Sequence, residues 1–520
     1  MGRLFGALGS ALWLGFGMTG LTLVAVPRSA SGPDALRQLA RCPRVDLQVT
    51  FGFNAARGFV INDPERPAAE VTAARGALQL SPEDPKEWLH LGTWLAETGD
   101  TNGATAALDH AVGLLRTRID RNPMDDDAQA SLGEALSQSG QSAEAERVLR
   151  SAVETNPTGW RSRVGLGQTL DTKWLNPQPG ATTPAGVAEG SAGSSKGEWQ
   201  SEASRLLDRA VELAPREPLV FRARGFHRFA VAQDTAGDRA TGAGPVNGSA
   251  AALAACGDYW QAATLARTNV LSWGVAGFTE LVARVGTAAG EGTDLAGLPA
   301  ESQQHLVAAF QALEGLAATE DTRSAAAALE VRGILQFLTR GRAGALATLR
   351  RAVALDPGRY QAWEILLALM VTGEDRDGLR ELCRERVRVR PAARNHLLLA
   401  KACERTGRLT EALEEAREAA RLSPQNPQVQ MTVVSLRLRT STDPESMDGI
   451  STRLQEIATH LDRMPKTPEW FTLAQHFVPT VCIYQGLIGN TEEARRMVGE
   501  WMKTNSSDTW AREIQSALGQ

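Results

Sequence analysis

Small and apolar residues recur along the chain at the spacing of paired amphipathic helices. Between residues 129 and 157 they occupy Leu132, Gly133, Leu136, Ala145, Leu149, Ala152 and Pro157. Leu132 and Leu136 lie four residues apart, and the alanines and leucine that follow keep helical spacing, so each set falls on one face of a helix. Gly140 is placed to end the first helix, and Pro157 ends the second. The pattern predicts a helical hairpin with one apolar side.

The same pattern returns elsewhere. The pattern is clear over residues 88–111, 167–215, 333–357, 363–391 and 399–424. It is weaker over residues 485–498, and only half of it is present over residues 74–82. One hairpin cannot bury its apolar side alone, so each copy must stack on a neighbour. Val and Ile rarely alternate with polar residues, which disfavours a sheet.

The order W-x2-L-G-x2-Y, then A-x3-F and then Pro is the signature of the tetratricopeptide repeat, a hairpin of about 34 residues. Trp88, Leu91, Gly92 and Leu95 occupy the first part of this order, with Leu in place of the usual Tyr. The sequence therefore resembles the tetratricopeptide repeat family. The resemblance implies an all-α solenoid of stacked hairpins, and it is strongest over residues 65–230 and 320–430.

We expect the chain to be organised around two repeat arrays, over residues 65–230 and 321–430. The first contains a loop insertion over residues 171–200, and a degenerate helical region over 231–320 contains a flexible tract over 235–251. Both inserts are rich in Gly, Pro, Ser and Ala, which favours loops. Residues 32–64 are expected to be a linker or irregular cap, and residues 431–520 to be degenerate helical repeats with a C-terminal cap.

An uncharged stretch of 23 residues runs from Leu4 to Val26. This length is sufficient for a helix to span a bilayer. Three interpretations of residues 1–31 stay open, namely an uncleaved signal anchor, a cleaved signal peptide and a buried helix. We favour a hydrophobic helix that anchors the chain in a membrane, with the body outside the cytoplasm. Arg3 lies on one side of the stretch and Arg28, Arg37 and Arg41 on the other, so charge does not decide the orientation.

The net charge of −5 and the pI near 5.9 argue against a general nucleic-acid binder, which would carry a basic field. The five cysteines are far apart and form no C-x-x-C motif. Cys383 and Cys403 fall on neighbouring predicted helices, so a disulfide is conceivable, but small buried apolar residues are the favoured interpretation.

The chain contains none of the common nucleotide-binding, zinc-protease or hydrolase motifs. Its seven histidines are scattered and do not pair at metal-ligand spacing. We therefore predict no catalytic residue, no metal site and no cofactor. The chain is interpreted as a non-catalytic scaffold for protein partners. Two alternatives are an exported adaptor for envelope assembly or polysaccharide machinery, and a divergent enzyme with helical repeats.

In tetratricopeptide arrays the first helix of each hairpin lines a concave groove. In each repeat, the residue directly after the glycine of the signature points into that groove by helical spacing. The residues four positions before and three positions after this residue point into it as well. The resulting candidate partner-binding residues are Thr93, Glu134, Gln168, Lys401 and Glu404, flanked by Leu89, Ala96, Ala130, Ser137, Val164, Asp171 and Leu397. The Lys and Asn pair that holds a partner's C-terminal carboxylate in some members is absent from these positions.

One arginine-rich segment, residues 379–394, offers a possible basic docking patch. Its candidate residues are Arg384, Arg386, Arg388, Arg390 and Arg394. A solvated helix end is one interpretation. The other is a docking patch for an acidic segment or for anionic lipid headgroups, since the guanidinium fork binds carboxylate and phosphate.

Overall fold

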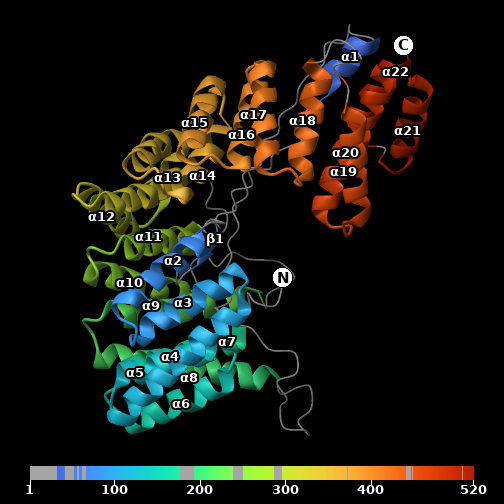
Figure 1. Ribbon diagram of the computed structural model, residues 1–520. Helices are drawn as coiled ribbons and strands as arrows, with labels where there is room; N and C mark the ends of the chain where they lie inside the picture. The colour runs from blue at the N-terminus through green and yellow to red at the C-terminus, as the bar shows by residue number, and fades with distance from the viewer. Residues whose placement is uncertain are drawn as a thin grey trace. The chain divides into compact units, whose positions relative to one another are not determined.

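The computed structural model is a succession of antiparallel helices (Figure 1). It describes residues 32–40, 52–54, 58–60, 66–175, 192–237, 250–285, 295–371, 373–440, 447, 449–505 and 507–519. These residues divide into two compact units, with the boundary between Ala362 and Trp363. Unit 1 contains the described residues from 52 to 362, and unit 2 contains residues 32–40 together with those from 363 onward.

The helices of unit 1 follow one another as hairpins. They are α2 (Arg66–Leu80), α3 (Pro85–Thr98), α4 (Thr101–Arg121), α5 (Asp126–Gln138), α6 (Ser142–Thr155), α7 (Trp160–Leu175), α8 (Ala192–Leu213), α9 (Pro218–Gly237), α10 (Ala250–Leu265), α11 (Val270–Val285), α12 (Ala300–Ala317) and α13 (Thr322–Leu355). A 3-10 turn at Leu295–Gly297 precedes α12. The antiparallel strands β1 (Gly52–Asn54) and β2 (Gly58–Val60) depart from the expectation of an all-helical chain.

Unit 2 continues the same arrangement. Its helices are α15 (Arg376–Val389), α16 (Ala393–Arg405), α17 (Leu409–Leu422), α18 (Pro427–Thr440), α19 (Ile450–Arg463), α20 (Pro468–Leu487), α21 (Thr491–Thr504) and α22 (Thr509–Gly519), joined by α1 (Gly32–Leu39). The boundary between the units falls in the first turn of α14 (Tyr360–Val371). The predicted division into six parts stays a prediction.

A glycine and a leucine bring the two helices together in several hairpins of unit 1. A Cβ atom added to Gly92 would lie 2.7 Å from Leu108, one on Gly133 2.6 Å from Leu149, and one on Gly333 2.7 Å from Leu349. Each glycine precedes its leucine by the same spacing in the sequence. The last pair lies within α13, which is broken at Gly341 (φ 69°), so its two halves form one hairpin.

The predicted helix ends are confirmed where the turns need a left-handed residue. Gly99, Gly140 and Gly407 have φ values of 86°, 81° and 75° directly after the first helices of their hairpins. Glycine adopts this conformation without the steric cost that a Cβ imposes. The first hairpins then share a continuous core, in which Leu108 and Leu132 are buried.

The two predicted insertions are shorter than expected at their edges. Helix α7 continues to Leu175 and α8 begins at Ala192, so much of the predicted loop over 171–200 is helical. Trp174 is buried in α7, and Trp199 of α8 lies 4.5 Å from the Lys173 ammonium. Likewise α9 reaches Gly237 and α10 begins at Ala250, inside the predicted tract over 235–251. Residues 176–191 and 238–249 lie outside the described residues.

The segment expected to be a linker or irregular cap begins with a packed helix. Leu36 and Leu39 of α1 are buried in a core with residues of α20, α21 and α22. The indole Nε1 of Trp510 donates a hydrogen bond of 2.9 Å to the carbonyl oxygen of Leu39. Gly486 makes room for this packing, since a Cβ there would lie 2.7 Å from Leu36.

The predicted hydrophobic helix over residues 1–31 lies outside the described residues. Within the part of the chain that the structure describes, none of the helices combines the length and the apolar character needed to cross a bilayer.

Candidate functional site

Polar side chains lie on the first helices of three successive hairpins in unit 1, and some of them connect these helices. We call these residues the first-helix face, and they are Lys86, Thr93, Asp127, Glu134, Gln138, Arg161 and Gln168. They lie on α3, α5 and α7, which contact one another in sequence. The face includes three of the residues predicted from sequence, Thr93, Glu134 and Gln168.

Hydrogen bonds and ion pairs cross this face from one hairpin to the next. The ammonium of Lys86 lies 2.9 Å from a carboxylate oxygen of Asp127, whose other oxygen lies 3.4 Å from Arg161. Thr93 Oγ1 lies 2.5 Å from Gln138 Oε1. Lys86 and Asp127 were not predicted from the sequence. Lys86 lies in the first turn of α3, and Asp127 lies in the first turn of α5. Together these contacts fix the relative register of α3, α5 and α7.

Glu134 is the most distinctive group on the face. Its side chain is exposed, and Oε1 accepts a hydrogen bond of 3.2 Å from Gln138 Nε2. The surrounding protein nevertheless limits its hydration and raises the pKa of Glu134, while attraction to Lys86 opposes the rise. An exposed carboxylate at this position can accept a further hydrogen bond from a bound partner. Gln168 occupies the equivalent position on α7 and is exposed.

Several predicted flanking residues belong to the core. Leu89, Val164 and Leu397, each four residues before a groove position, are buried, whereas Ala96, Ala130 and Ser137 are half-buried. Asp171 is also buried, and its Oδ1 lies 2.7 Å from His227 Nδ1 and accepts a hydrogen bond from Trp174 Nε1. These side chains pack against neighbouring helices because the packed side of the first helix is wider than helical spacing alone suggests.

In unit 2 the two predicted groove residues are bonded to each other. Lys401 Nζ donates to Glu404 Oε2 at 2.7 Å, and Arg439 of α18 donates to Glu404 Oε1 at 2.6 Å. The Glu404 side chain is 8% exposed, so two cations already satisfy it. This pairing explains why unit 2 offers no counterpart of Glu134 among its described groove residues.

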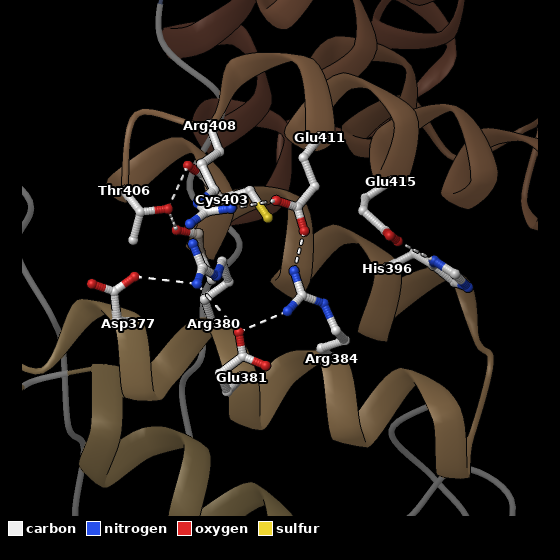
Figure 2. Close-up of polar contacts among 11 residues, drawn as sticks. Asp377, Arg380, Glu381, Arg384, His396, Cys403, Thr406, Arg408, Glu411 and Glu415 are labelled. Carbon is white, nitrogen blue, oxygen red and sulfur yellow. Dashed lines mark hydrogen bonds and ion pairs between the residues drawn. The ribbon is translucent and has the colours of Figure 1, made fainter.

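The predicted basic docking patch is not an open surface. Figure 2 shows Arg384 on α15 between Glu381 and Glu411, with ion pairs to both. These hydrogen bonds raise the pKa of Arg384 and lower that of Glu411, although burial works in the opposite direction for the carboxyl. Arg384 therefore joins α15 to α17.

The other predicted arginines of this patch also differ in environment. Arg386 is 1% exposed and its guanidinium lies 5.3 Å from the ring centre of Trp363. Arg394 donates two hydrogen bonds, of 2.6 and 2.7 Å, to the buried carboxylate of Glu364. Arg388 is exposed and Arg390 is half-buried. The sequence suggested one surface because it does not reveal that carboxylates one hairpin away pair with these guanidiniums.

The cysteines of the described residues are buried thiols. Burial raises the pKa of Cys383, Cys403 and Cys482 to about 12. A thiol with so high a pKa carries little of the nucleophilic thiolate at neutral pH. Within the described ranges, no group of three His, Cys, Asp or Glu residues is arranged to hold a metal ion.

The sequence pattern of the tetratricopeptide repeat matches residues 393–426. This range contains α16 and α17, whose hairpin turns at the left-handed Gly407. Residues 393–426 are therefore a tetratricopeptide repeat. The hairpins of unit 1 that turn at Gly99 and Gly140 have the same left-handed glycine outside the matched range.

Solved helical-repeat structures give weaker likenesses. Human IFIT1, in a dimer with PPP-AAAA, is 16% identical over 69% of this chain and 69% of that chain, with a TM-score of 0.34. Yeast Tom70 is 14% identical over 88% and 93% of the two chains, with a TM-score of 0.28. TTC0263, a tetratricopeptide protein of Thermus thermophilus, is 13% identical over 68% and 98%, with a TM-score of 0.19. These scores are low, so we rest no argument on them. No curated protein matches the chain.

Proposed function

We propose that this protein is a non-catalytic interaction scaffold whose first-helix face binds an extended or helical segment of a partner protein. The observation that carries the proposal is the placement of Glu134 and Gln168. Both are exposed polar residues directly after a helix-packing glycine, on consecutive first helices. Side chains repeated at one position of a stacked array can contact one extended ligand along its length.

The chemistry of the face favours a polar or basic partner segment. Glu134 offers a poorly hydrated carboxyl, and Gln168 offers both a donor and an acceptor. A partner Lys, Arg or amide group that reaches Glu134 can donate a hydrogen bond to its carboxylate. The bonds among Lys86, Thr93, Asp127 and Gln138 hold the helices in place before binding, which reduces the entropy that binding must offset.

A peptide library displayed on phage tests the proposal. The full-length chain should enrich a family of related peptides, and Glu134→Arg combined with Gln168→Arg should abolish the enrichment. Glu154→Arg, at an exposed carboxylate of the second helix α6, is the matched control and should leave it intact. Enrichment that survives the double substitution, or that Glu154→Arg abolishes equally, would refute the first-helix face as the binding site.

We also propose that residues 1–31 tether this scaffold to a membrane, with the body outside the cytoplasm. The support is the uncharged stretch from Leu4 to Val26, which is long enough to span a bilayer. An exported adaptor with a cleaved signal peptide is the alternative.

A further inference from the structure

An open hollow of about 740 Å³ lies in unit 2 among α17, α18 and α19. These three helices follow one another in the chain and pack in sequence (Figure 1). The hollow is separate from the first-helix face, which belongs to unit 1. Its described lining residues do not include the arginines of α15, which the sequence suggested as a docking patch.

Each of the three helices contributes guanidinium groups to the wall of the hollow. They are Arg417 and Arg421 from α17, Arg437 from α18 and Arg453 from α19. Arg417 and Arg421 are exposed, whereas Arg437 and Arg453 are half-buried. The floor is formed by α18, where Gln430 is 7% exposed and Val433 2% exposed.

Positive charge predominates in this wall. Glu456 is the single carboxylate among the described lining residues, against four guanidiniums. Arg421 is bonded to Glu418 on the same helix, at 2.6 Å, and both residues lie near the solvent. Arg453 donates a hydrogen bond to Gln430 Oε1, which orients its guanidinium over the floor. The chain as a whole has a net charge of −5, so this concentration of positive charge is local.

We infer that this hollow binds an acidic peptide segment of a partner protein through two or more carboxylates. Guanidinium groups bind carboxylates through paired hydrogen bonds, and their distribution over three helices matches charges spaced along a peptide. Ala420 and Val433 provide apolar contact for the stems of Asp and Glu side chains. A nucleic acid would need a broader basic field, and a lipid bilayer presents a flat surface, whereas these groups surround a recess.

The test uses the full-length chain and a fluorescein-labelled octaglutamate peptide, with binding followed by fluorescence anisotropy at low salt. Octaglutamate should bind, octaglutamine should not, and added salt should weaken binding because ions screen exposed charges. Arg417→Gln combined with Arg421→Gln should weaken binding about tenfold or more, since both guanidinium groups that α17 contributes to the wall are removed.

The matched control removes two exposed arginines that do not line the hollow, through Arg376→Gln and Arg512→Gln. It changes the net charge equally and should leave octaglutamate binding unchanged. Circular dichroism verifies that both variants remain helical. Failure of the parent chain to bind octaglutamate, or equal weakening by both variants, would overturn the inference. Loss of binding to phosphatidylserine vesicles in the hollow variant, without peptide binding by the parent, would point to lipid and would also overturn it.

Discussion

The close approach of the two helices in a hairpin depends on the missing side chain of a glycine. Leu149 fills the space beside Gly133, where a Cβ would lie 2.6 Å from its side chain. Because Leu149 is fully buried, it cannot move away without disturbing its own neighbours. The same contact at Gly92 and Gly333 shows that these hairpins share one packing solution.

The substitution Gly133→Ala should therefore destabilise the protein by about 1–3 kcal/mol, the usual cost of an overpacked core. Gly113 of α4 is the control, because it is exposed in a helix interior and a Cβ there meets nothing within 4 Å. Gly113→Ala should stabilise the protein by about 0.5–1 kcal/mol, since glycine is a poor helix former. Urea denaturation measures both changes. Equal effects of the same sign would contradict the proposed packing.

The raised pKa of Glu134 predicts a pH dependence of stability. The folded chain binds this proton more tightly than the unfolded chain, so the free energy of unfolding falls as the pH rises from the ordinary value of 4.5 through the raised pKa. Glu134→Gln removes this loss and keeps the acceptor for Gln138. The variant should melt at a higher temperature than the parent at pH 7, and the difference should shrink as the pH falls below 4.5.

The exchange Glu154→Gln on α6 controls for the loss of one negative charge. The difference in melting temperature between Glu154→Gln and the parent should be the same at pH 7 and below pH 4.5. A Glu134→Gln variant no more stable than the parent at pH 7 would show that the protein around Glu134 does not hinder its ionisation.

At the residue scale, the sequence was sufficient for positions that depend on local spacing. Gly133, Gly140 and Leu149 were predicted correctly because helix periodicity and turn chemistry determine them within one hairpin. The environments of Arg386 and Glu404 were not predictable in this way. Trp363 contacts Arg386, and Arg439 contacts Glu404. Both partners lie on other helices, so no local sequence pattern predicts these contacts.

At the element scale, α1 is the helix that local pattern failed to place. Its sequence, GPDALRQL, has only a short apolar side, and its partners lie at the opposite end of the chain. The helix is stabilised by packing against α20 and α22, which supplies the burial that an eight-residue helix cannot obtain alone. The edges of the insertion between α7 and α8 were missed for a similar reason, because Trp174 and Trp199 pack and extend the helices.

Removing residues 1–41 should destabilise unit 2, whereas removing residues 1–31 should not. Full burial of one leucine side chain contributes roughly 1.5–3 kcal/mol, so the loss of Leu36 and Leu39 should cost about 3 kcal/mol or more. Tryptophan fluorescence during urea denaturation reports the change, since Trp510 loses its bond to Leu39. Identical denaturation midpoints for the two truncations would mean that α1 does not stabilise the core.

At the scale of the whole molecule, the hairpins were predictable because the same pattern is written many times. A repeat array is stabilised mainly through contacts between neighbours, so each copy supports the interpretation of the next. The carboxylate–guanidinium pairs between hairpins, such as Glu364 with Arg394 and Glu330 with Arg359, were not predicted. Charged residues are common on solvated helices, so their pairing leaves no distinct signal in a single sequence.

The proposed membrane tether is a property of the whole chain and rests on the uncharged stretch Leu4–Val26. The full-length protein should pellet with membranes and resist extraction with alkaline carbonate, because uncharged residues of this length are stable in hydrocarbon. The protein without residues 1–31 should remain in the supernatant. Recovery of the full-length chain in the supernatant with its N-terminus intact would exclude the tether.

The binding of a partner segment to the first-helix face is the central claim, and site-specific photo-cross-linking tests it most directly. A benzophenone amino acid replaces Glu134 in one protein and Glu154 in another, and each is irradiated with a peptide enriched from the displayed library. We expect a cross-linked peptide from position 134 and none from position 154, with mass spectrometry locating the bond. Cross-linking from position 154 alone would place the partner on the second helices and contradict binding at the first-helix face.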